Sequence, residues 1–135
     1  MVVSEENVEV VRRANAALNR GDIEGALSDY LEGAEIRDLR SAPDQPLVAS
    51  GKEAIRAIWV EWNAAFHDLR ADVDEWIEAG DCVIGHVHWW GTGRESGLAI
   101  DTRQYDLFEV RDGRIVRGVL GYASRAEALD AARPG

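Results

Sequence analysis

The 135-residue sequence contains few of the features that mark disulfide-rich, membrane-spanning or nucleic-acid-binding proteins. Cys82 is the only cysteine, so no intramolecular disulfide can form. No run of apolar residues approaches the ~18 that a membrane-spanning helix requires, and we expect no membrane association. Lysine is limited to Lys52, and 15 basic residues stand against 25 acidic ones. The net charge of −10 disfavours phosphate backbones and anionic membranes as partners, so we expect no nucleic-acid binding.

The bulk composition is that of an ordinary soluble globular protein. Hydrophobic residues make up 46% of the chain and charged residues 30%, and the length suits one domain over residues 1–135. The segment 1–6 is acidic and lacks the apolar stretch of a signal peptide. We therefore expect a single cytoplasmic domain.

The spacing of apolar residues predicts helices in the first half of the chain. A first helix spans about 4–19 and stops at Gly21, and a short second helix lies within 22–33. A strand is expected over 34–40. After a proline-containing loop at 41–49, a capping box formed by Ser50 and Glu53 starts a third helix that extends to about residue 67.

The second half of the chain has the pattern of a strand meander. Four runs with strand character, separated by turn signals, lie at about 69–78, 82–92, 99–110 and 114–122. A second capping box, Ser124 and Glu127, opens a short C-terminal helix. This order predicts an α+β fold in which a curved antiparallel sheet wraps around the three N-terminal helices. Such a cone leaves a cavity at one end, and cavities of this kind are common ligand sites.

Two of the predicted strands place groups that can move protons beside apolar residues. His86, His88 and Trp90 alternate in one run, and Gln104, Asp106, Phe108 and Val110 share a face of the next. Burial of such groups is costly unless they are paired or functional. Alternation does not decide the orientation of the first run, because its other face is wholly apolar: Val83, Gly85, Val87 and Trp89.

Three stretches carry a resemblance to a known family: 10–22, with its helix–Gly–Asp–helix opening, 51–55 at the start of the third helix, and 108–116 around the last hairpin. They resemble the nuclear transport factor 2-like superfamily of cone-shaped α+β domains, in particular its SnoaL-like and ketosteroid-isomerase-like branches. This fold hosts many functions, so the resemblance indicates the fold more specifically than an activity.

The resemblance implies candidate catalytic positions. The isomerase uses a carboxylate base together with a Tyr and a protonated Asp that bind the substrate oxygen. The base position falls on Asp38 and the acid on Asp106, whereas the Tyr position falls on Ala14, which departs from the isomerase. Positions of the apolar pocket wall fall on His86, His88 and Trp90. The resemblance also implies a homodimer formed through the outer face of the sheet.

Each of these carboxylates and histidines also has a structural interpretation. Asp38 is equally consistent with an exposed turn residue, and Asp106 with a structural partner of Arg103 or Arg117. The two histidines are also consistent with an exposed or dimer-facing surface. Because local spacing supplies no third ligand beside them, we expect no metal. We also expect no cofactor.

Further residues are expected to line the ligand pocket. They are aromatic or polar side chains near the predicted catalytic groups, and a glycine that leaves space: Trp59, Trp62, Trp90, Gln104, Phe108, Gly118 and Tyr122.

Two hypotheses about function follow. In the first, the protein is a cofactor-independent isomerase, cyclase or dehydratase-like lyase acting on a small, largely apolar, carbonyl-bearing ligand. Asp38 moves a proton, and Asp106, helped by His86 or His88, stabilises or protonates the oxygen. In the second, the same fold is a non-catalytic ligand-binding or dimerisation module, which the alanine at position 14 favours.

Overall fold

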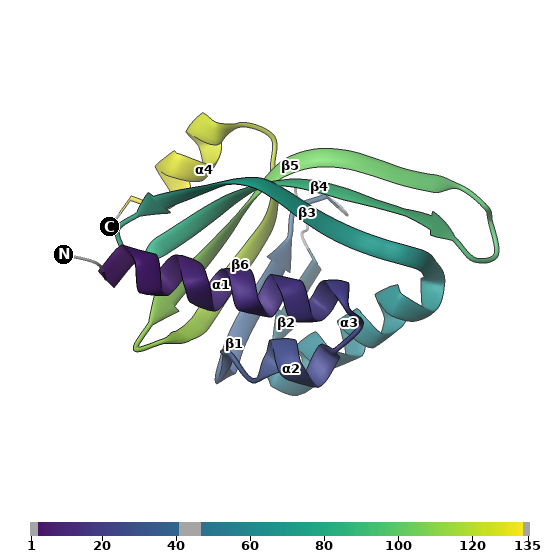
Figure 1. Ribbon diagram of the computed structural model, residues 1–135, viewed down its shortest axis with the longest axis horizontal. Coiled ribbons are helices and arrows are strands. Elements are labelled where there is room, and N and C mark those ends of the chain that lie inside the picture. The colour runs from purple at the N-terminus through teal and green to yellow at the C-terminus, as the bar shows by residue number, and fades with distance from the viewer. Residues whose placement is uncertain (1–2, 41–46, 134–135) are drawn as a thin grey trace.

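A computed structural model of the protein describes residues 3–40 and 47–133. The predicted α+β order is confirmed, with helices first, a strand meander next and a short helix last (Figure 1). The elements are α1 (Val3–Asn19), α2 (Ile23–Leu27), β1 (Tyr30–Asp38), β2 (Leu47–Ser50), α3 (Lys52–Ala65), β3 (Phe66–Ala79), β4 (Cys82–Gly93), β5 (Ala99–Arg111), β6 (Arg114–Tyr122) and α4 (Arg125–Ala131). Among the described residues, no helix combines the length and the apolar character needed to cross a membrane.

The strands form one curved sheet in the order β2-β1-β6-β5-β4-β3. The meander from β3 to β6 is antiparallel, as predicted. The structure adds two features. Strand β1 pairs with β6 in parallel, and the short strand β2 pairs with β1 within the segment predicted to be a loop. Parallel pairing joins segments far apart in the chain, so local alternation does not reveal it.

The two predicted capping boxes have different outcomes. Ser50 is the last residue of β2, and the N-cap of α3 is Gly51, which has a φ of 89° and makes no side-chain cap. The Ser50 cap was therefore wrong. Ser124 caps α4 as predicted, because its Oγ accepts a hydrogen bond from the Glu127 N–H at 3.1 Å. The predicted start of α1 at Ser4 involves a side chain outside those described.

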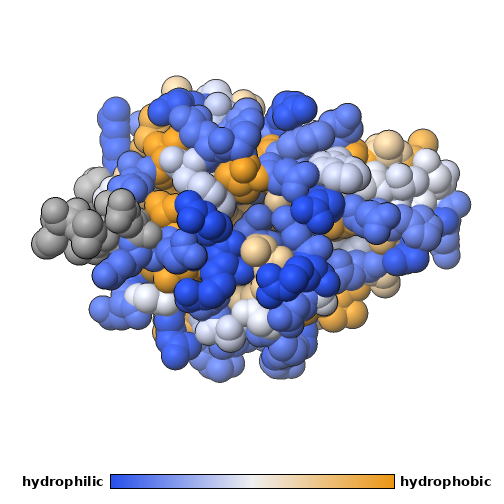
Figure 2. Space-filling view, viewed as in Figure 1, coloured by the Kyte–Doolittle hydropathy of each residue, from blue (hydrophilic) through white to orange (hydrophobic). Residues whose placement is uncertain are grey.

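The main core lies between the helices and the concave face of the sheet. Helix α1 presents small residues to it, including Val11, Ala14 and Ala17, so the helix approaches the sheet closely. From α3, Ile55 and Trp59 point into the same core. The opposite side of these helices carries polar side chains, and Figure 2 shows a largely hydrophilic surface on the face where α1 lies in front.

Helix α4 covers part of the convex face of the sheet. Its Ala128 packs with Cys82, Ile84 and Leu107 in a second, smaller apolar cluster. Burial raises the pKa of the Cys82 thiol, which suits a packing residue and not a reactive one. Both faces of the central strands are therefore covered over part of their length. Alternate side chains of the same strands pack into the main core and into the smaller cluster.

Candidate functional site

A small inner cavity lies between the helices and the concave face of the sheet. Its volume is about 30 Å³, enough for one or two water molecules. Aromatic side chains dominate its walls, with Tyr30, Trp59, Trp62 and Trp89 among them. Of the described residues that line it, Asp106 alone is charged.

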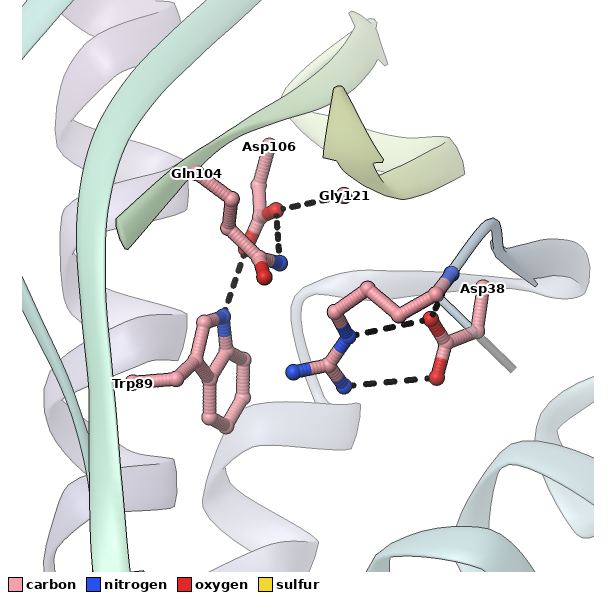
Figure 3. Close-up of polar contacts among 6 residues, drawn as sticks. Asp38, Trp89, Gln104, Asp106 and Gly121 are labelled. Carbon is pink, nitrogen blue, oxygen red and sulfur yellow. Dashed lines mark hydrogen bonds and ion pairs between the residues drawn. The ribbon is translucent and has the colours of Figure 1, made fainter. Parts of the chain in front are cut away.

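The Asp106 carboxylate is held by three N–H groups (Figure 3). Its Oδ2 accepts from Trp89 Nε1 at 2.9 Å. Its Oδ1 accepts from Gln104 Nε2 at 2.7 Å and from the Gly121 N–H at 3.0 Å. The residue is only 1% exposed, and burial raises the pKa of its carboxyl even though these hydrogen bonds and the charge of Arg40 act in the opposite direction. The neutral form of Asp106 is thus favoured more than in an exposed carboxyl.

A β-bulge in β6 supplies one of these donors. The register shifts between the pairs Tyr105–Tyr122 and Asp106–Leu120, which leaves Gly121 as an extra residue on β6. Gly121 has a φ of 105°, a conformation that suits glycine, and a Cβ atom there would lie 2.7 Å from Arg40 Cγ. The bulge therefore points the Gly121 N–H at Asp106 and requires glycine at this position.

Gln104 supports Asp106 from the same strand. Residues 104 and 106 of β5 share the concave face because strand side chains alternate. The Gln104 side chain is 3% exposed, and its Oε1 is buried with no hydrogen-bond partner among the described residues. An unpaired buried acceptor of this kind suits contact with a ligand donor or an ordered water.

Tyr30 is a polar residue of the cavity that the sequence analysis missed. The apolar spacing placed it in the second helix, but the helix ends at Leu27 and Tyr30 begins β1. Its ring packs edge-on against Trp59, with centroids 5.3 Å apart. Burial, followed by the negative charge of Asp106, raises the pKa of its hydroxyl. The hydroxyl therefore remains a hydrogen-bond donor at neutral pH.

A larger outer pocket lies on the other side of two tryptophans. It has a volume of about 380 Å³ and is lined by Asp38, Arg40, Trp62, Phe66, Leu69, Trp89, Ile100 and Thr102. Trp62 and Trp89 line both spaces and meet edge-to-face, with ring centroids 6.0 Å apart. These two rings therefore separate the inner cavity from the outer pocket.

Asp38 lies in the outer pocket as half of an ion pair. It is 5% exposed, and its Oδ1 accepts from the backbone N–H of Arg40 at 3.0 Å and from Arg40 Nε at 3.1 Å. Its Oδ2 lies 3.3 Å from Arg40 Nη2. The Arg40 guanidinium also lies over the Trp89 ring, 5.4 Å from the centroid. Figure 3 shows the Asp38 carboxylate turned toward the side on which Trp89 and Asp106 lie.

The fold agrees with a comparison against protein families. The family model of the SnoaL-like domain matches residues 11–118. The chain belongs to the SnoaL-like family. This membership confirms the resemblance stated above. Among curated proteins, none matches the chain.

Solved structures support the fold of this SnoaL-like domain. A putative SnoaL-like polyketide cyclase from Jannaschia sp. CCS1 is 19% identical in sequence to this protein, with a TM-score of 0.77. The alignment covers 100% of this chain and 97% of the cyclase chain. Bal32a, from a soil-derived mobile gene cassette, is 26% identical with a TM-score of 0.74 and coverages of 95% and 96%. A protein with a ketosteroid isomerase-like fold from Catenulispora acidiphila DSM 44928, in complex with trimethylamine, is 16% identical with a TM-score of 0.75 and covers 92% of each chain.

The SnoaL-like domain does not bring His86, His88 and Trp90 into the cavity. The apolar face of β4, which includes Val87 and Trp89, occupies the concave side, so the predicted orientation of this strand was wrong. The reason is that an apolar face gains more from burial against the helices than a face carrying two imidazoles.

On the convex face, each of these three side chains has a carboxylate partner. His86 Nδ1 lies 2.8 Å from Asp74 Oδ1, and His88 Nε2 lies 2.5 Å from Asp101 Oδ1. Trp90 Nε1 donates to Asp72 Oδ2 at 2.7 Å. His86 also stacks on Tyr105, with centroids 4.6 Å apart. Within the described residues, no three His, Cys, Asp or Glu side chains are grouped as metal ligands would be.

The remaining predicted pocket residues divide between the two faces. Trp59, Trp62 and Phe108 line the inner cavity. At Gly118 the expected free space is filled, because a Cβ there would lie 2.8 Å from Ile36 Cδ1. Tyr122 packs on the convex side against the cluster beneath α4.

Proposed function

We propose that this SnoaL-like domain binds a small, largely apolar, carbonyl-bearing ligand and that Asp106 hydrogen-bonds or protonates the carbonyl oxygen. The supporting observation is the Asp106 carboxyl itself. It is 1% exposed, faces an aromatic cavity and has an upward-shifted pKa. The reaction class is cofactor-independent acid/base chemistry of the isomerase, cyclase or dehydratase type.

The hydrogen bonds of Asp106 indicate which oxygen carries the proton. Oδ1 accepts from both Gln104 and Gly121, whereas Oδ2 accepts only from Trp89. A carboxyl oxygen has two lone-pair sites, so the neutral acid carries its proton on the less occupied Oδ2. From there the acid donates to a ligand oxygen, and a neutral carboxylic acid in an apolar site is well suited to that task.

The volumes of the two spaces determine where the ligand lies. The inner cavity of about 30 Å³ is too small for a ligand, whereas 380 Å³ falls within the range of small-molecule sites. The ligand body therefore occupies the outer pocket. Its carbonyl reaches Asp106 when the Trp62 side chain changes rotamer. Trp89 stays in place because Asp106 and Arg40 both hold it.

Asp38 is the second proton-handling group of this proposal, and the histidines are not part of it. Asp38 lines the outer pocket beside Arg40, and its carboxylate acts as the base toward a ligand bound there. His86 and His88 lie on the convex face and are replaced as helpers of Asp106 by the Tyr30 hydroxyl, which lines the same cavity.

The fold relatives support small-molecule chemistry in general terms. One structure is of a putative polyketide cyclase, and another holds trimethylamine. A second candidate function is ligand binding without turnover. The Asp38–Arg40 ion pair favours it, because the guanidinium already contacts both oxygens of this carboxylate.

Binding of an apolar ketone tests the role of Asp106. The probe is 2-acetylnaphthalene, which carries no ionisable group, and binding is measured by calorimetry across the pH range in which circular dichroism shows a folded protein. Wild type should bind at low pH and lose affinity as pH rises through the pKa of Asp106.

The variant Asp106→Asn should bind with no such pH dependence. The exposed control Asp130→Asn, on α4, should behave as wild type. A pH-independent wild type, an unchanged profile in Asp106→Asn, or no binding at about 1 mM ketone would each contradict the proposal.

A further inference from the structure

Among the described residues that line the outer pocket, Arg40 is the one cation. Its guanidinium carries five N–H donors in a planar fork. Asp38 engages the Nε and Nη2 nitrogens, and the described residues give Nη1 no partner. Among the described residues, no acceptor occupies the edge of the fork that is formed by Nη1 and the second Nη2 hydrogen.

The guanidinium is held in a fixed position beside the pocket. The Asp38 contacts hold one edge, and the Trp89 ring lies 5.4 Å below the Arg40 Cζ. The side chain is 28% exposed, so it is partly desolvated yet reachable. Such pre-organisation reduces the entropy that an arginine loses on binding a carboxylate.

The other walls of the pocket are mainly apolar. Phe66, Leu69 and Ile100 contribute aliphatic or aromatic surface, and Trp62 adds an indole face. A ligand that satisfies this site has an apolar body and one anionic end. We propose that the outer pocket is an anion subsite in which Arg40 binds the carboxylate of an amphipathic acid through the Nη1–Nη2 edge.

This inference rests on the proposed function and narrows its substrate class to apolar carbonyl compounds that also carry a carboxylate. The net charge of −10 does not oppose it strongly. Distant surface charges are screened within about 8 Å at physiological ionic strength, whereas a contact ion pair with a partly buried arginine is screened much less. A guanidinium with two edges also accommodates two carboxylates, Asp38 on one and the ligand on the other.

A matched pair of probes tests the subsite at pH 7.5. The first is 2-naphthoate, and the second is 2-naphthamide, which has nearly the same shape and no charge. Binding is followed by quenching of tryptophan fluorescence and by calorimetry. Wild type should prefer the acid by about tenfold or more, as expected of a charge-assisted bond to arginine.

Three variants separate the subsite from general effects of charge and folding. In Asp38→Asn/Arg40→Gln, which removes both charges together, the preference for the acid should disappear. Arg40→Lys keeps the charge without the fork and should retain only part of it. Arg37→Gln, which removes an exposed arginine of β1, should leave the preference unchanged. Circular dichroism and thermal unfolding verify that each variant is folded.

Equal affinity of wild type for the acid and the amide, a full preference in the double variant, or no binding of either probe at about 1 mM would overturn the subsite. These outcomes are distinct from failure of the proposed function. If wild type shows no preference for the acid, the role of Arg40 is contradicted. If its affinity for 2-acetylnaphthalene does not depend on pH, the role of Asp106 is contradicted. Either result can occur without the other.

Discussion

Trp89 and Asp106, on neighbouring strands, are joined by an indole-to-carboxylate hydrogen bond of 2.9 Å. The Trp89 side chain takes part in both spaces of the site. Its nitrogen holds the buried acid of the inner cavity, and its ring forms a wall of the outer pocket beneath Arg40. Trp89 therefore contributes to both spaces, which makes its pair with Asp106 a sensitive place for mutation.

Trp89→Phe should raise the pKa of Asp106 further and destabilise the protein. The substitution removes a donor that favours the carboxylate and leaves Oδ2 without a described partner. We expect a loss of about 1–3 kcal/mol in the free energy of unfolding, measured with urea at neutral pH. Trp90→Phe is the matched control, because its indole binds an exposed carboxylate on the convex face, and its cost should stay within about 0.5 kcal/mol. Equal costs for the two variants would contradict this account.

Gly121→Ala should be destabilising because of the backbone conformation at the bulge. The φ of 105° is strained for alanine, and the new Cβ would lie 2.7 Å from Arg40 Cγ. The expected cost is about 1–3 kcal/mol in urea unfolding. Gly33→Ala, where no neighbouring atom lies within 4 Å, should change stability by no more than about 0.5 kcal/mol. A Gly121→Ala protein as stable as Gly33→Ala would show that the bulge is not required.

The raised pKa of Asp106 predicts a specific dependence of stability on pH. The folded protein binds this proton more tightly than the unfolded chain, so the contribution of Asp106 is largest at low pH. It should fall as pH rises from about 3.9, the ordinary value of an aspartate, through the raised pKa, and then level off. The loss amounts to about 1.4 kcal/mol per pKa unit of difference.

Urea unfolding of wild type and Asp106→Asn at a series of pH values isolates this contribution, because other carboxylates contribute equally to both proteins. The difference in free energy of unfolding, wild type minus variant, should decrease with rising pH. Asp130→Asn, which alters an exposed side chain, should show no such trend against wild type. A flat or increasing difference for Asp106→Asn would rule out a raised pKa.

Replacement of the convex-face histidines should leave ligand binding intact. His86 and His88 contact Asp74 and Asp101 on the side of the sheet opposite Asp106. His86→Gln and His88→Gln should therefore bind 2-acetylnaphthalene within about twofold of wild type across the same pH range. A loss of affinity of about tenfold would show that the histidines contribute to ligand binding and would contradict this prediction.

The sequence was sufficient for those features that depend on local pattern. Helical spacing predicted the helices, and alternation with Phe108 and Val110 correctly placed Asp106 on the concave face. For β4 the same alternation was ambiguous, because both faces were plausible and the imidazoles were assigned to the wrong one. Burial of the apolar face decided the orientation.

Other features depended on long-range structure. The position of Tyr30 in the cavity follows from the parallel pairing of β1 with β6, which no local signal indicates. The partner of Asp38, in contrast, could have been identified from the sequence. Arg40 lies two residues further along the chain, just past the end of β1, so a search for i, i+2 charge pairs would have found it.

The titration of the Asp106 carboxyl tests the central claim most directly. Carboxyl ¹³C NMR of the protein, assigned with Asp106→Asn, measures the pKa with and without 2-acetylnaphthalene. We predict a pKa clearly above the ordinary aspartate value of about 3.9 and a further rise when the ketone is bound, because the ketone binds the neutral acid. A pKa at or below that value, unmoved by the ketone, would contradict the account.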